Sequence, residues 1–129
     1  MEVFIAYARK ASSLGEHLLA YDIAKVGLDL NPTSTLLVQL AALAQARSGS
    51  PLRALALLEP LLNCQENVED TYGILARAYK DLWSRSEKPE EKTSFGEKSL
   101  ELYQKVFAKW SLSYLSDPQK KRFGMSNPL

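Results

Sequence analysis

The centre of the chain, Leu36 to Leu62, carries two apolar helical stripes separated by one polar turn. The first stripe has the three- and four-residue spacing that places side chains on one face of a helix, and consists of Leu36, Leu40, Leu43 and Ala44. The second consists of Leu52, Leu55, Leu58, Leu61 and Leu62. Between them, Gly49 can end a helix and Pro51 suits the first turn of the next one. The pattern predicts two antiparallel helices, neither of which can bury its stripe without neighbours.

Similar patterns lie on both sides of this unit. Residues 2–14 and 17–30 predict a helix pair that turns at Gly15 and stops before Pro32, because the residue before a proline avoids the helical conformation. We expect its buried positions to be Val3, Phe4, Tyr7, Ala8, Ala11, Leu14, Leu18, Leu19, Tyr21, Ile23, Val26 and Leu28. The polar residues 33–35 offer caps for the next helix, and Pro60 should kink or shorten the fourth. Residues 69–83 predict a fifth helix.

Residues 84–98 interrupt the order because they are polar and include Pro89 and Gly96. The apolar pattern resumes at Leu100 and continues to Phe107. We therefore interpret 84–98 as an insertion between the last two helices. Connections of this length are uncommon unless they are functional or flexible, and we favour a mobile surface loop over a binding loop. Trp83 and Trp110 flank this segment and are expected to be partly exposed.

The chain repeats itself with a shift of 34 residues. The shift places Gly15 on Gly49, Ala20 on Ala54 and Leu28 on Leu62, and small residues recur at Ala8, Ala42 and Ala76. A period of about 34 residues with helix, glycine turn and helix resembles the tetratricopeptide repeat. The aromatic positions of that repeat are absent from the first two units, and the third supplies Tyr72 and Tyr79.

This resemblance implies an all-α fold, a right-handed superhelical solenoid of about three antiparallel helix pairs. The expected repeats cover residues 1–34, 35–68 and 69–110, the third being split by the insertion, with a tail at 116–129. Together they form one domain over residues 1–129.

A narrower resemblance rests on residues 69–83 (EDTYGILARAYKDLW), with GEHLLAYDIAKVGL before them and SLELYQKVF after them. These segments resemble the repeat region of bacterial signalling proteins related to the TRAFs-binding region of apoptosis-signal-regulating kinases. In those proteins, the repeats accompany effector domains such as nucleotide cyclases. The resemblance implies a regulatory interaction segment without catalytic residues.

Composition narrows the class of protein further. The chain has 129 residues, a net charge of +1 and 24% charged residues, so no strong field favours nucleic acid or an anionic membrane. It has one cysteine, Cys64, no apolar run long enough for a membrane helix, and no pattern of a signal peptide at its start. We expect a cytoplasmic protein with no membrane or nucleic-acid partner.

Residues for catalysis or metal binding are sparse. His17 is the one histidine and is expected on the solvated surface, so neither a triad nor a histidine metal site is supported. Cys64 has no second cysteine or histidine near it in sequence. The basic residues 120–122 are favoured as a solvated tail over a contact for an anionic partner. We expect no enzyme activity, no cofactor and no metal.

A binding surface is the remaining candidate. In the tetratricopeptide fold the first helix of each repeat lines the concave side, and the matching positions here include Arg9, Gln39, Leu43, Arg47, Arg77 and Lys80. The cationic members could bind carboxylates, and arginine could do so with two hydrogen bonds. Salt bridges to neighbouring repeats are the alternative use and the favoured one. The column does not match the Lys/Asn carboxylate clamp of chaperone-binding repeats.

Two functions are therefore expected. The first is a non-catalytic interaction scaffold that binds a peptide or protein through the concave helix face. The alternative is a structural or regulatory segment of a larger multidomain signalling protein, such as a nucleotide cyclase or kinase, packed against its own neighbouring domain. In the alternative, an apolar end around Trp110 to Leu115 would promote self-association through the C-terminal helix.

Overall fold

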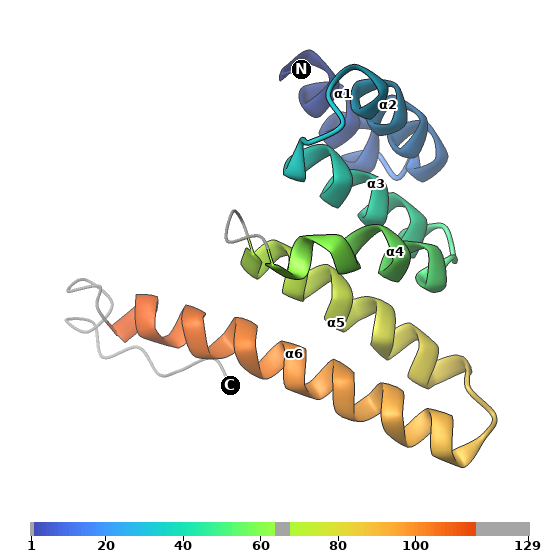
Figure 1. The fold of residues 1–129 in the computed structure, drawn as a ribbon, viewed down its shortest axis with the longest axis vertical. Coiled ribbons are helices and arrows are strands. Elements are labelled where there is room, and N and C mark those ends of the chain that lie inside the picture. Colours follow the sequence, from blue (N-terminus) through green and yellow to red (C-terminus); the bar gives the residue numbers. More distant parts are fainter. Residues whose placement is uncertain (1, 64–67, 116–129) are drawn as a thin grey trace.

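The described residues form a row of six α-helices and one 3-10 helix (Figure 1). The structure is a computed structural model that describes residues 2–63 and 68–115, with side chains as far as residue 108. The elements are α1 (Glu2–Ser13), α2 (His17–Leu30), α3 (Thr35–Arg47), α4 (Pro51–Leu58), η1 (Glu59–Asn63), α5 (Val68–Arg85) and α6 (Pro89–Leu115). Each helix packs on the next in the chain, and α3 also touches α1 and α5. This is the helical-solenoid arrangement that the repeat predicts.

The turns between paired helices follow the predicted signals. Gly15 and Gly49 adopt left-handed conformations, with φ of 81° and 93°, which only glycine reaches without strain. Ser34 caps α3, where its hydroxyl oxygen accepts a hydrogen bond from the backbone N–H of Leu37 at 3.3 Å. As Pro60 predicted, α4 is short: it ends at Leu58 and the chain continues as η1.

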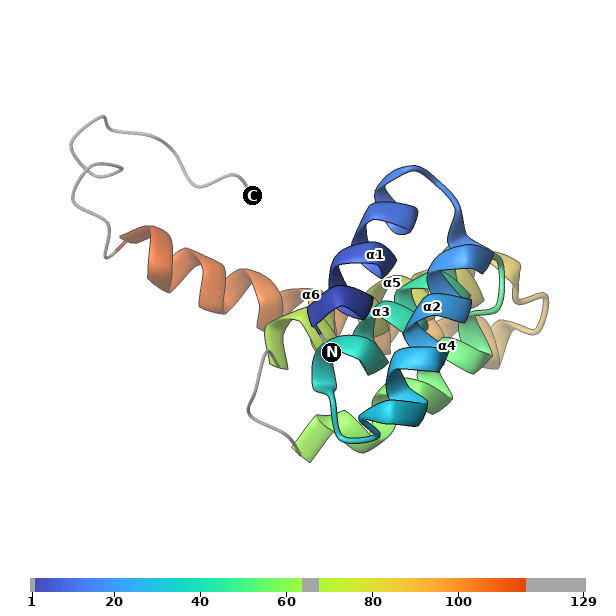
Figure 2. The same cartoon turned by 90° about the horizontal axis from the view of Figure 1, so that it is seen from above.

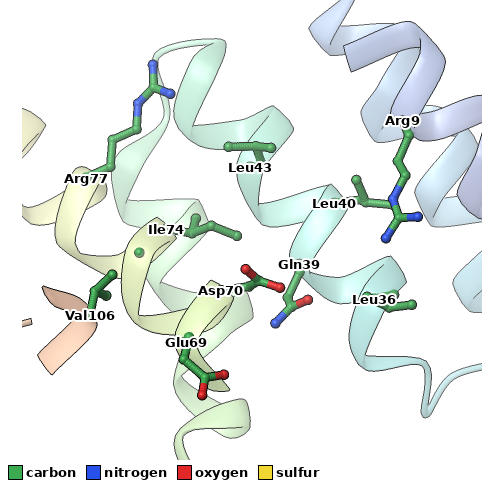
Figure 3. Close-up of a pocket in the computed structure, with 11 residues that line it drawn as sticks. Arg9, Leu36, Gln39, Leu40, Leu43, Glu69, Asp70, Ile74, Arg77 and Val106 are labelled. Carbon is green, nitrogen blue, oxygen red and sulfur yellow. The ribbon is translucent and has the colours of Figure 1, made fainter. Parts of the chain in front are cut away.

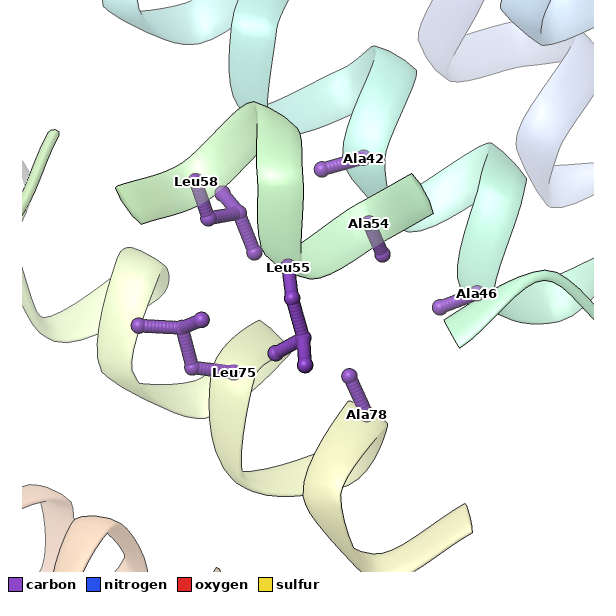
Figure 4. Packing of buried hydrophobic residues seen from close by; sticks show 7 residues of the cluster. All are labelled: Ala42, Ala46, Ala54, Leu55, Leu58, Leu75 and Ala78. Atoms are coloured by element: carbon purple, nitrogen blue, oxygen red, sulfur yellow. The ribbon is translucent and has the colours of Figure 1, made fainter. Parts of the chain in front are cut away.

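Small residues rather than leucines make most of the core between the first four helices. Ala8, Ala24, Leu37 and Ala41 form one buried cluster, and seven residues around α4 and α5 form another (Figure 4). Gly27 lets α1 and α3 approach α2 closely, because a Cβ there would lie 2.9 Å from both Phe4 Cβ and Leu37 Cδ1. Close helix crossing therefore explains why alanine recurs with the repeat period.

Several residues expected in the core are exposed instead. The prediction of burial is wrong for seven residues that are at least half-exposed: Val3, Tyr7, Leu14, Leu18, Leu19, Val26 and Leu52. The stripe of Leu36, Leu40 and Leu43 is only partly buried, whereas Leu37 and the alanines of α3 are fully buried. A helix in the middle of the row is covered on several sides, so its apolar stripe alone does not identify the core face.

The predicted insertion at residues 84–98 is wrong. Residues as far as Arg85 belong to α5, a three-residue turn follows, and α6 begins at Pro89. Proline is favoured in the first turn of a helix. Glu90 and Glu91 stabilise the same first turn, because their negative charges lie at the positive end of the helix dipole. The segment is polar because this half of α6 packs on α5 alone, which leaves most of its surface in solvent.

The last helix pair is longer than the others and packs differently. Ser99 is buried, and its hydroxyl donates a hydrogen bond of 2.8 Å to the Ala76 carbonyl of α5. The Trp83 ring lies against Gly96, where a Cβ would come within 2.9 Å of it, and remains 42% exposed. Figure 2 shows α6 extending beyond the other helices.

Candidate functional site

A groove crosses the side of the row formed by α1, α3 and α5 (Figure 3). It has a volume of about 480 Å³, which lies within the usual range of ligand sites. Its floor is apolar and is formed mainly by Leu36, Leu40, Leu43, Ile74 and Val106. The partly buried leucine stripe of α3 is thus the floor of a surface groove.

Charged groups stand at the edges of this floor. Arg9 of α1 and Arg77 of α5 contribute two guanidinium groups, and Glu69 and Asp70 of α5 contribute two carboxylates. Within the described residues, neither arginine makes a hydrogen bond or ion pair, and the single salt bridge joins Lys105 to Glu101 in α6. Salt bridging between repeats, the favoured use of these arginines in the sequence analysis, is therefore absent from this part of the chain.

The structure brings four of the six predicted site residues together. Arg9, Gln39, Leu43 and Arg77 all line the groove. Arg47 does not line it; its guanidinium donates a hydrogen bond of 2.8 Å to the Ser12 hydroxyl. Lys80 lies farther along α5, in a smaller hollow that it shares with α6.

Gln39 has a structural role in addition to its position at the groove. Its side chain is 5% exposed, and its Nε2 donates a hydrogen bond of 3.0 Å to the hydroxyl of buried Thr71. This bond joins α3 to α5. Gln39 therefore links the two groove walls through a buried hydrogen bond.

Sequence reasoning did not find every lining residue. The sequence predicts Leu40 in an apolar helical stripe, Glu69 as a solvated charge and Val106 in the apolar pattern after Leu100, and it assigns no role to Ile74. Ser99, Tyr103 and Val106 follow the spacing of one helix face. This face of α6 lies against α5, as the hydrogen bond from Ser99 to Ala76 shows.

No group of three or more metal-ligating side chains occurs among residues 2–63 and 68–108, whose side chains the structure describes. His17, predicted on the solvated surface, is partly buried, and its Nδ1 is buried without a hydrogen-bond partner in the described part. Cys64 and the basic residues 120–122 lie outside the described residues, as do the side chains from Trp110 to Leu115.

A family described as Tetratricopeptide Repeats-Sensor matches residues 10–122, most of the chain. The chain belongs to this family. The match confirms a tetratricopeptide-type repeat, and repeats of this type are generally non-catalytic scaffolds for protein interactions. The narrower resemblance to the TRAFs-binding region of kinases stays a prediction.

Two further comparisons yielded no relative of this Tetratricopeptide Repeats-Sensor chain. No curated protein and no solved structure matches it. Among the described residues, none of the helices has the length and apolar character needed to cross a lipid bilayer.

Proposed function

We propose that the chain is an interaction scaffold whose groove on α1, α3 and α5 binds a segment of a protein partner. One observation carries the proposal: a partly buried leucine floor, accessible from the groove, lies beside two guanidinium groups that have no partner within the described residues. Exposed apolar surface in a concave site is typical of ligand and partner binding. Arginine is enriched in such interfaces because it combines charge, planar shape and apolar contact.

The distribution of charge indicates what the bound segment carries. Apolar side chains would pack on Leu36, Leu40 and Leu43, and a carboxylate would pair with Arg9 or Arg77. Asp70 is exposed at the edge of the same groove and would repel a segment that is acidic throughout. An apolar segment with one acidic residue therefore fits better than a uniformly acidic one.

The test compares two charge reversals. The folded chain captures partners from host lysate beside the variants Arg77→Glu and Arg53→Glu, and the captured protein is then purified and titrated directly. Arg53 is a matched control because it is also an exposed helical arginine but lies on α4, away from the groove. A partner that loses affinity with Arg77→Glu and keeps it with Arg53→Glu supports the groove. Equal affinity for both variants contradicts the site.

A second candidate is a structural or regulatory segment of a larger signalling protein in the cytoplasm. The observation that favours it is the outer surface of the first helix pair, where Val3 and Tyr7 are each 62% exposed and Leu30 is 72% exposed. Leu19 and Val26 belong to the same stripe of α2 as Leu30, by their seven- and four-residue spacing. The family name, which describes its members as sensors, fits a regulatory role.

This candidate predicts that the isolated chain self-associates through apolar contacts. Sedimentation at several concentrations measures the association, and the variant Val26→Lys/Leu30→Lys tests the α2 surface. Association that the double variant removes supports the second candidate. A chain that stays monomeric at all concentrations contradicts it and leaves the groove proposal unaffected.

A further inference from the structure

A second cleft lies on the opposite side of α5 from the groove. Tyr72, Leu75 and Tyr79 of α5 face it, whereas Gly73 and Arg77 face the groove. The cleft has a volume of about 440 Å³ and is closed on its other sides by α6 and η1. On the η1 side the cleft is left open because α4 ends at Leu58, before Pro60, and the short 3-10 helix η1 follows in its place.

The wall between α5 and α6 is a symmetric ladder of three pairs. Lys105 Nζ lies 5.3 Å from the centre of the Tyr72 ring, and Lys98 Nζ lies 5.4 Å from that of Tyr79. Leu75 and Leu102 occupy the position between these pairs in the same antiparallel register. The cleft thus presents cation, apolar contact and cation, with the two lysines seven residues apart, or about 10.5 Å along α6.

Both lysines are available to an external carboxylate. Lys98 has no ion pair within the described residues, and Lys105 meets Glu101 at 3.8 Å. Both members of that pair are more than half exposed, and exposed pairs of this kind contribute little. The cation–π contacts hold the two ammonium groups above the rings, which lowers the cost of ordering them when a partner binds.

We propose that this cleft binds an amphipathic helix of a protein partner that carries two carboxylates seven residues apart with apolar residues between them. Seven residues are two helical turns, so both carboxylates lie on one face and match the spacing of Lys98 and Lys105. The apolar residues pack on half-buried Leu102 and exposed Leu62, whereas Leu75 is 2% exposed and forms the base of the cleft beneath them. Glu59 at the η1 side repels further acidic residues there, so charge fixes which side of the helix faces α6.

The tyrosines contribute to the same recognition. Burial, followed by the charge of Glu59, raises the pKa of Tyr79 above its ordinary value of 10.0. Its hydroxyl is protonated at neutral pH, as that of any tyrosine with the ordinary pKa also is, and can donate a hydrogen bond to a carboxylate. This cleft is independent of the groove proposal, because the two sites share no lining residue.

The test selects phage-displayed helical peptides with randomised surface positions on the full chain. Each selected peptide is then titrated against the wild type, Lys98→Glu/Lys105→Glu, Glu101→Gln and Arg77→Glu. The proposal expects peptides with Asp or Glu seven residues apart around apolar residues. Their affinity should fall roughly tenfold with the lysine double variant, since two exposed ion pairs are reversed. Glu101→Gln should raise affinity about twofold by releasing Lys105, and Arg77→Glu should leave it unchanged.

Circular dichroism checks that the lysine double variant is folded, and Lys98→Gln/Lys105→Gln is the milder substitute if it is not. The proposal is overturned if no selected peptide depends on the lysines, or if lysine-dependent peptides lack the carboxylate pair. A dimer of the chain itself that the lysine double variant dissociates would also overturn it, because the occupant would then be a second copy. Loss of binding to Arg77→Glu alone would instead support the groove.

Discussion

The first four helices and the last pair bury their contacts in different ways. Between α1 and α4 the contacts are made by alanines, a glycine and a few leucines, and the helices have 8 to 14 residues. In α5 and α6 the helices have 18 and 27 residues, and much of the seam consists of aromatic rings beneath lysine ammonium groups. Small side chains give close crossing, whereas the lysine–aromatic seam leaves a cleft between α5, α6 and η1.

The difference should be visible first in the effect of truncating one leucine from each region. Leu37→Ala removes a fully buried side chain from the close-packed region, so we expect it to lower the free energy of unfolding by about 3 kcal/mol. Leu100→Ala in α6 removes a side chain that is 61% exposed and should change it by less than about 0.5 kcal/mol. Urea denaturation followed by circular dichroism measures both. Equal effects would remove the distinction between the two regions.

Glycine substitutions sharpen the comparison. Gly27→Ala places a methyl group 2.9 Å from Phe4 Cβ and Leu37 Cδ1, and such overpacking destabilises by about 1 to 3 kcal/mol. Gly73→Ala in α5 meets no atom within 4 Å, so helix propensity should raise stability by up to about 1 kcal/mol. Thermal melts compare the signs. A stabilising Gly27→Ala would mean that α1 can move away from α2 at little cost.

One polar contact across the junction between the two regions is the hydrogen bond from Gln39 to Thr71. Thr71→Val removes the hydroxyl that accepts this bond, and we expect a loss of about 1 to 2 kcal/mol because a buried amide loses a partner. The double variant Gln39→Leu/Thr71→Val should lose less than the sum of the single variants. A double-mutant cycle by urea denaturation gives the coupling. Strict additivity would show that the bond does not set how α3 meets α5.

The smallest expected effect concerns the seam itself. The pKa of Tyr79 is raised in the folded chain, so at alkaline pH the unfolded chain releases this proton first. Its contribution to stability is present below pH 10.0 and declines as the pH rises through the folded pKa. Tyr79→Phe should therefore flatten the loss of stability above that pH relative to the wild type. Urea denaturation at several alkaline pH values measures the free energy of unfolding against pH. If the slope is the same for Tyr79→Phe and the wild type, the Tyr79 ring does not lie in the buried seam.

The boundaries of the first four helices were predictable because local signals mark them. Gly15, Gly49, Pro32 and Pro51 act within a residue or two, so tertiary contacts were not needed to place the turns. The core of these helices was less predictable, because exposed Leu18 and Leu30 have the same sequence character as buried Leu37. Only the position of a helix within the row decides which face is covered.

The last pair was less predictable for a related reason. Residues 84–98 are polar because one neighbour is enough to hold that part of α6, and polarity alone suggested a loop. The overlooked signal was the start of the helix at Pro89, followed by two glutamates. Because residues 84–98 were interpreted as a loop, Val106 was not predicted in the groove. The pairing of Lys98 and Lys105 with the tyrosines was not predicted either.

Because α6 is longer than α5, a small rotation of α6 would produce a large displacement at its far end. A helix of 27 residues is roughly 40 Å long at 1.5 Å per residue, and one of 18 residues, such as α5, is roughly 27 Å long. Any rotation at the seam between them grows with distance along the helix, so that a rotation of about 5° at the start of α6 would displace its far end by about 3.5 Å over that length. A partner that binds in the groove or in the cleft and rotates α6 would therefore also move the far end of this helix.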